Sequence, residues 1–260
     1  MVVMYYSNVH GQAGTSTNML TAGIMADILY CKKSIMLQTQ FRLNQLEVSL
    51  MNESARKEIL EYEIGIDALM KGIKAGRNTK ELLKNCCISL PGSNIDFLPG
   101  TNSSNRHLYE EEILRQFREI LLLAKEVYEI VYVDIGYMEK DIASRMWQEA
   151  DVLVVNLCQN IRVLNDFFNC FYGAENVVYI IGNYDKYSKL NLRTLFRLYK
   201  GLRNDNCFAI PYNTEVKDSM SEAGLINFFY KNIACNEEDY NYDIINGTRK
   251  AVSKIMEFFE

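Results

Sequence analysis

Residues 7–20 read SNVHGQAGTSTNML; they follow an apolar run at residues 2–6 and precede a stretch with the apolar spacing of a helix. This stretch contains two glycines, Gly11 and Gly14, and three consecutive hydroxyl residues, Thr15, Ser16 and Thr17. A glycine turn between a strand and a helix is typical of a phosphate-binding loop, because its backbone amides point at the ligand. Such a loop usually contains a lysine, whereas this one contains neither lysine nor arginine. The sequence thus predicts a strand–loop–helix unit that forms an anion cradle without cations.

The composition indicates one globular domain with a sizeable core. The 260 residues are 48% hydrophobic and 23% charged, which suits a single α/β domain over residues 1–260. The formal net charge of −5 argues against a globally basic nucleic-acid binder. Seven cysteines without a C-x-x-C pair, and only two histidines, disfavour a zinc site and favour reduced thiols. With no basic leader and no apolar run of transmembrane length, we expect a cytoplasmic protein.

Short β-branched and aromatic runs alternate with longer helical patterns. We expect strands at residues 2–6, 35–37, 96–98, 129–134, 152–156, 176–182 and 207–210. We expect one helix directly after the first loop and another over residues 53–85, with interruptions at Gly65, Gly72 and Gly76. A long helix should include residues 113–124, and further helices should lie at residues 140–147, 161–171, 191–199, 225–232 and 243–259. Strands this apolar on both faces belong in a mostly parallel sheet with helices on both faces, which is a doubly wound α/β fold. Ligands of such sheets bind beyond the carboxyl ends of the strands.

Four segments together resemble the MinD/ParA group of deviant Walker-A ATPases, including its TadZ/CpaE-like branch. In chain order they are HGQAGTST at residues 10–17, IVYVDIG at residues 130–136, YIIGNYD at residues 179–185 and AIPYNTEVKDSMSEAG at residues 209–224. In the family the first segment is the P-loop, the second carries an acidic residue, and the last two lie beside the adenine. Their order and spacing, over nearly the whole chain, carry the resemblance. It implies a P-loop NTPase fold of the MinD/ParA type.

The resemblance also implies a site for ATP or ADP with Mg²⁺. The residues that it implies for phosphate and nucleotide binding are His10, Gly11, Gln12, Ala13, Gly14, Thr15, Ser16, Thr17, Asn183, Pro211 and Tyr212. Ser16 would be a ligand of Mg²⁺, and Asp134 would support the metal through water. Two alternatives stay open: Asp134 caps the turn after its strand, and the glycines of the loop serve close packing only.

Three positions depart from the family's pattern. His10 aligns with the signature lysine, Thr15 aligns with the P-loop lysine, and residues 35–40 (IMLQTQ) lack the D-x-D that orients the attacking water. An ammonium about 4 Å from a phosphate charge is worth roughly 4 kcal/mol at an effective dielectric near 20, and about 1.4 kcal/mol is tenfold in affinity. Phosphoryl transfer needs positioned cations and a residue that orients the water. We therefore predict no ATP hydrolysis and assign no catalytic residue, while weak nucleotide binding stays open.

Three hypotheses on function follow. The first is a degenerate MinD/ParA-like protein that acts as a non-hydrolysing scaffold or adaptor and positions or regulates a bacterial pilus, secretion or partition apparatus. The second is an ATP- or ADP-binding switch that dimerises, with weak or no hydrolysis. The third is a DNA-binding protein of the partition type, although the net charge does not favour a nucleic-acid partner. The first two imply protein partners, among them a second copy of the chain, and membrane association only through a partner.

Two surface segments bear on the partners. Arg193, Arg197 and Lys200 are spaced to form one stripe on a helix, which is either a face for an anionic partner or a solvated helix face. Residues 251–259 carry an apolar surface with few basic neighbours. We expect this C-terminal helix to dock on the protein's own sheet and not on a membrane.

Overall fold

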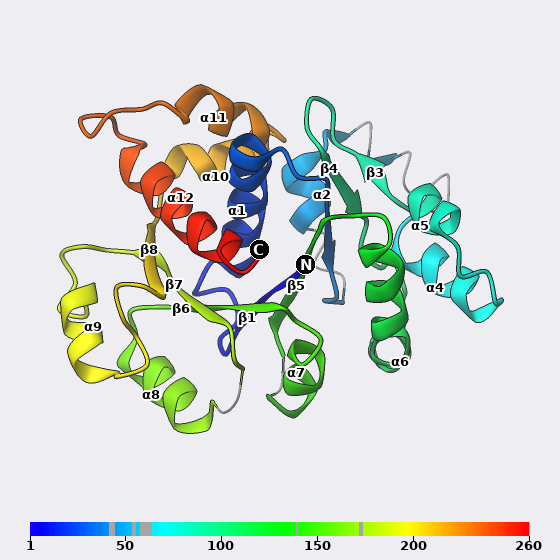
Figure 1. The fold of residues 1–260 in the computed structure, drawn as a ribbon, viewed down its shortest axis with the longest axis horizontal. Helices are drawn as coiled ribbons and strands as arrows, with labels where there is room; N and C mark the ends of the chain where they lie inside the picture. The colour runs from blue at the N-terminus through cyan, green and yellow to red at the C-terminus, as the bar shows by residue number, and fades with distance from the viewer. Residues whose placement is uncertain (42–44, 54–55, 58–63, 139, 172–173, 260) are drawn as a thin grey trace.

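Eight strands form one sheet in the order β3-β4-β2-β5-β1-β6-β7-β8 (Figure 1). The structure is a computed structural model that describes residues 1–41, 45–53, 56–57, 64–138, 140–171 and 174–259. The strands are β1 (Val2–Ser7), β2 (Ser34–Gln38), β3 (Ile88–Ser89), β4 (Ile95–Leu98), β5 (Ile130–Tyr137), β6 (Val152–Leu157), β7 (Val177–Tyr184) and β8 (Cys207–Pro211). β3 pairs antiparallel with β4, and the other pairings are parallel. The strand order reverses at β1, between β5 and β6, where doubly wound sheets bind ligands.

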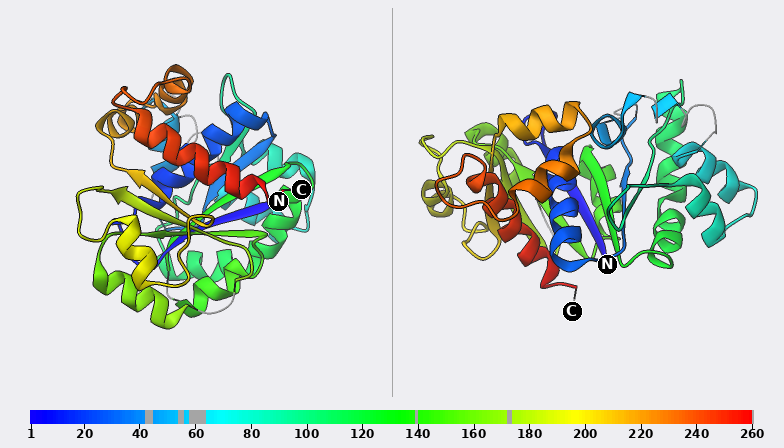
Figure 2. Two further views of the ribbon diagram at one scale, coloured as in Figure 1. Left: turned by 60° about the vertical axis from the view of Figure 1, so that its left-hand side comes forward. Right: turned by 90° about the horizontal axis from the view of Figure 1, so that it is seen from above.

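Helices cover both faces of the sheet (Figures 1 and 2). One face carries α1 (Thr15–Tyr30), α2 (Gln45–Leu50), α10 (Thr214–Ser221), α11 (Leu225–Asn232) and α12 (Tyr242–Met256). The other face carries α4 (Ile66–Lys74), α5 (Lys80–Cys86), α6 (Arg106–Lys125), α7 (Lys140–Trp147), α8 (Ile161–Cys170) and α9 (Leu192–Leu198). The predicted doubly wound, mostly parallel fold is therefore confirmed.

The sequence of β1 explains why both faces are covered. All six of its residues are buried. Because side chains alternate across a strand, Met4 and Tyr6 pack in the core under α6 to α8, whereas Val3 and Tyr5 pack in the core under α1 and α12. A strand that is apolar on both sides is stable only between two helical layers.

The predicted strands are all present, but the helical prediction for residues 53–85 needs correction. Residues 54–55 and 58–63 of that range lie outside the described residues. Gly65 precedes α4 and Gly76 follows it, both with positive φ, as the predicted interruptions require. Gly72 does not interrupt a helix: it lies inside α4, where a Cβ would come within 2.5 Å of Leu82 in α5. The glycine therefore allows the close approach of two helices. Three elements were not predicted from the sequence: α2, α10 and the two-residue β3.

The C-terminal helix docks on the fold, as predicted. α12 buries one apolar face, formed by Ile244, Ile245, Thr248, Ala251, Val252, Ile255 and Met256. It contacts β8 and α1, and Figure 2 shows it crossing beside α1, with both chain termini at the same end of the molecule. Among the helices of the described residues, none combines the length and the apolar character needed to cross a membrane.

Candidate phosphate-binding site

The loop after β1 has the backbone shape of an anion cradle. Gly11 and Gly14 have φ angles of 72° and 65°, which favour glycine. Gly14 is the N-cap of α1, and no side chain caps the first turn of this helix. The amides of that turn have no partner within the helix, and they lie at the positive end of its dipole. His10, Gly11 and Gln12 are exposed, so an anion has access from solvent.

Amide side chains hold this loop against the ends of β6 and β7. Asn18 Nδ2 donates to Ala13 O at 3.2 Å and to Asn156 Oδ1 at 2.8 Å. Asn183 Nδ2 donates to Gln12 O at 2.9 Å. The implied base contact Asn183 thus binds the loop itself, and Asn18 was not predicted from the sequence. Asn18 and Asn156 are both buried, and Asn156 lies inside the apolar run of β6, which is a signal that sequence can show.

Close packing of β7 also fixes the loop. A Cβ on Gly182 would lie 1.9 Å from the carbonyl oxygen of Ala13. That separation is far below van der Waals contact, so only glycine permits this approach. The loop is therefore shaped by neutral contacts, without a cation.

Asp134 lies at the centre of the site, with no solvent exposure. Ser16 Oγ donates to its Oδ2 at 2.5 Å, and Gln40 Nε2 donates to its Oδ1 at 3.1 Å. Burial raises the pKa of the Asp134 carboxyl to about 6, against hydrogen bonds from Ser16, the Gly136 amide and Gln40, which lower it. Asp134, which the resemblance implies as support for the metal, thus accepts a hydrogen bond on each of its two carboxylate oxygens.

This raised pKa predicts a pH-dependent stability. The folded state favours the protonated Asp134 carboxyl. Its contribution to the free energy of unfolding is therefore present at low pH and is lost as the pH rises through about 6. Between pH 5 and pH 7 the unfolding free energy should fall by about 1 kcal/mol from this group. Chemical denaturation of the protein and of Asp134→Asn at both pH values checks this, because the variant should lack that part of the slope. Equal slopes would contradict the assignment to Asp134.

The end of β2 offers amides and a hydroxyl in place of the missing carboxylates. Gln38, Thr39 and Gln40 follow one another here, and the Thr39 amide donates to Asp134 O at 3.0 Å. A carboxylate that the sequence analysis missed, Glu47 of α2, accepts from Gln38 Nε2 at 3.2 Å and from the Gly100 amide at 2.5 Å. Burial raises the pKa of Glu47, and both of its oxygens are engaged. Glu47 thus links α2 to β2 and β4 and does not replace a water-orienting carboxylate.

The site fits Mg²⁺ only together with a phosphate. The described residues contain no group of three or more histidine, cysteine, aspartate or glutamate side chains that could hold a metal. The Ser16 hydroxyl donates its hydrogen to Asp134, and its oxygen keeps lone pairs. This oxygen would therefore be one ligand of a phosphate-bound Mg²⁺. Phosphate oxygens and water would have to supply the rest.

The remaining predicted residues lie away from the loop. Pro211 and Tyr212 line a pocket at the outer edge of β8, and none of residues 10–17 lines that pocket. Arg193 and Arg197 are exposed on α9. α9 ends at Leu198, so exposed Lys200 follows the helix and does not continue its face.

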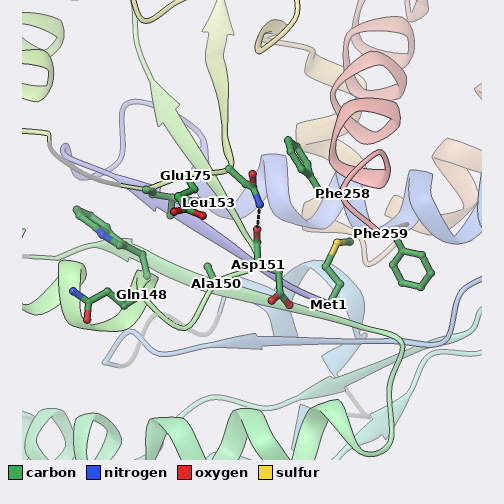
Figure 3. Close-up of a pocket in the computed structure, with 11 residues that line it drawn as sticks. Met1, Gln148, Ala150, Asp151, Leu153, Glu175, Phe258 and Phe259 are labelled. Carbon is green, nitrogen blue, oxygen red and sulfur yellow. Dashed lines mark hydrogen bonds between the residues drawn. The ribbon is translucent and has the colours of Figure 1, made fainter.

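A second pocket, of about 750 Å³, lies at the opposite end of the sheet. Met1, Asp151, Glu175 and Phe258 are among its lining residues (Figure 3). Because these residues come from the starts of strands and from the end of the chain after α12, the pocket is remote from the loop. It cannot form part of the phosphate site.

Comparisons with known proteins identify the fold. No family model matches the sequence, and no curated protein does. A ParA family ATPase from Chlorobium tepidum is similar in structure over 97% of this chain and 98% of its own, with a TM-score of 0.72 and 12% identity. MinD from Pyrococcus horikoshii, complexed with Mg-ADP, matches over 98% and 96%, with a TM-score of 0.67 and 14% identity. A chain of the MinC:MinD cell division protein complex of Aquifex aeolicus matches over 98% of this chain and 96% of its own, with a TM-score of 0.64 and 16% identity. The chain therefore has the P-loop NTPase fold of the MinD and ParA ATPases.

Proposed function

We propose that this protein is a non-hydrolysing scaffold or adaptor built on the MinD/ParA fold. The observation that carries the proposal is the bonding of Asp134, whose two oxygens are taken by Ser16 and Gln40. The loop beside this network contains no lysine or arginine, and β2 ends in Gln38, Thr39 and Gln40. Among the described residues, this site has neither the cations nor the water-orienting carboxylate that phosphoryl transfer uses.

Exposed apolar side chains at the carboxyl edge of the sheet support a role in protein binding. Tyr137 at the end of β5 is 50% exposed, Ile161 at the start of α8 is 42% exposed, and Tyr212 after β8 is 56% exposed. All three follow the carboxyl ends of strands and share that edge of the sheet with the loop. Aromatic residues there are typical of a protein interface. The partner is a second copy of the chain or a component of a bacterial pilus, secretion or partition apparatus, with any membrane contact made through it.

A second candidate function is a nucleotide-dependent dimerisation switch. The uncapped first turn of α1 and the open space around Gly11 favour it, since both suit an anion. The MinD neighbour complexed with Mg-ADP is consistent with this candidate. In this function the protein would bind ATP or ADP weakly, and His10 would replace a lysine when protonated.

The hydrolysis assay tests the scaffold proposal. Purified protein with ATP and Mg²⁺ should release phosphate no faster than the same mixture without protein, because no carboxylate in the described part of the site is free to orient the water. The matched variant Asp134→Ala should give the same background rate. Turnover by the wild-type protein that disappears in Asp134→Ala would sink the proposal.

Self-association separates the two candidates. Sedimentation velocity should give the same mass with and without millimolar ATP for a scaffold. A monomer that becomes a dimer only with ATP would favour the switch.

A further inference from the structure

A pocket of about 650 Å³ follows the free edge of β8, the last strand of the sheet. Its walls come from the end of β7, the start of α9, β8 and α12. The apolar part is formed by Leu192, Cys207, Phe208 and Ala209. The volume lies in the range of roughly 300–1,000 Å³ that small-molecule sites occupy.

The pocket exists because the two helical layers do not meet at this edge. Phe208 and Ala209 are half-buried, whereas every residue of β6 is buried. Cys207 belongs to the core on the α9 side, and Phe208 packs against the core on the α12 side. The pocket therefore reaches around the strand, with apolar walls from both layers.

The edge is not open to an added strand from a partner. A Cβ on Gly247 would lie 2.3 Å from the carbonyl oxygen of Ala209, so the backbone of α12 already covers β8 at its middle. An incoming strand would have to displace this helix. The space beside it accepts a compact ligand, not a continuous strand.

One lysine at the pocket has no ion-pair partner among the described residues. Lys186 forms an ion pair with Asp243 at 3.6 Å, which joins the β7–α9 segment to α12. Asp185 Oδ1 accepts from the Tyr187 amide at 2.9 Å. Lys250 also lines the pocket and is exposed, and it forms no ion pair with any residue that the structure describes. An anionic group beside Lys250 would form the ion pair that this lysine lacks.

We propose that this pocket binds a small molecule with a flat apolar body and one anionic group. The body lies against Leu192, Phe208 and Ala209, and the anion lies beside Lys250. None of residues 10–17 lines the pocket, so the site is separate from the phosphate loop, although it shares Pro211 and Tyr212 with the implied nucleotide residues. The proposal does not rest on the scaffold function.

Two fluorescent probes test the charge part of the proposal. 1-Anilinonaphthalene-8-sulfonate has a flat apolar body and one anionic group, and N-phenyl-1-naphthylamine has a similar body without the charge. The sulfonate should bind the wild-type protein at one site, and Lys250→Ala should weaken it by about fivefold, as for a partly exposed charge pair. The neutral probe should bind both proteins equally. Lys231→Ala, which removes an exposed lysine of α11 outside the pocket, should change neither affinity.

A filled pocket tests the location. Ala209→Leu should abolish binding of both probes while circular dichroism shows an unchanged fold. Unchanged binding in folded Ala209→Leu would overturn the proposal, as would an equal loss of sulfonate binding in Lys231→Ala and Lys250→Ala. If Ala209→Leu does not fold, the comparison of the two probes in Lys250→Ala still tests the proposal. An equal effect of Lys250→Ala on the binding of both probes would reject the site.

Discussion

Thr15→Lys should tighten the binding of ATP at least tenfold, and without a gain in hydrolysis. Thr15 opens α1, next to the uncapped amides of its first turn, so a lysine here reaches an anion held by the loop. An ammonium about 4 Å from a phosphate contributes up to roughly 4 kcal/mol, from which the ordering of the side chain subtracts. About a third of that gain corresponds to tenfold. Hydrolysis should stay at background, because β2 still ends in glutamine and threonine.

Isothermal calorimetry with ATP and Mg²⁺ measures this effect. Thr15→Met is the matched control, since methionine has similar length and no charge. If the lysine and methionine variants bind ATP equally weakly, the loop is a packing turn and not a phosphate site. That result would leave the scaffold proposal standing and would remove the nucleotide switch.

Gly182→Val should destabilise the fold by more than 3 kcal/mol. The first added atom would lie 1.9 Å from Ala13 O and within 2.9 Å of the Asn18 side chain. The Ala13 carbonyl belongs to the backbone, so it cannot move away without displacing the loop or β7. Overpacking against a flexible neighbour already costs about 1–3 kcal/mol. The Asn18 and Asn183 bonds to the loop should weaken together with the packing.

Urea denaturation of Gly182→Val against wild type checks this cost. Gly224→Ala is the control, because its φ is −101° and the nearest atom to its added Cβ is 3.7 Å away. The control should change stability by less than about 0.5 kcal/mol, as substitutions away from packed features do. A similar small effect for Gly182→Val would mean that β7 does not clamp the loop.

Local sequence was sufficient to predict the elements at the centre of the fold. The apolar run of β1 and the positions of Gly11 and Gly14 indicate a strand, a turn and a helix, because backbone preference and side-chain periodicity act over a few residues. The short β3 was missed, since two residues carry no periodicity. The interruption at Gly72 was predicted wrongly, because a glycine that ends a helix and one that admits a neighbouring helix look alike in sequence.

The bonding of the site could not be predicted in the same way. Gln40 and Asp134 are 94 residues apart and meet because β2 and β5 are neighbours, with Gln38 opposite Asp134. Glu47 reaches Gly100 across 53 residues for a similar reason. Strand order is decided by how all the layers pack, and no local pattern records it.

By itself, the sequence determined that this protein forms a doubly wound α/β fold with a glycine loop that has lost its cations. Residue identity is enough for both conclusions, since continuous apolar strand segments and a loop without lysine or arginine are properties of the chain. Only the tertiary structure decided what took the place of the missing charges. Asp134 is held by Ser16 and Gln40, and the loop is held by Asn18, Asn183 and the close approach of Gly182. These contacts join distant segments, so they exist only once the sheet has brought the strand ends together.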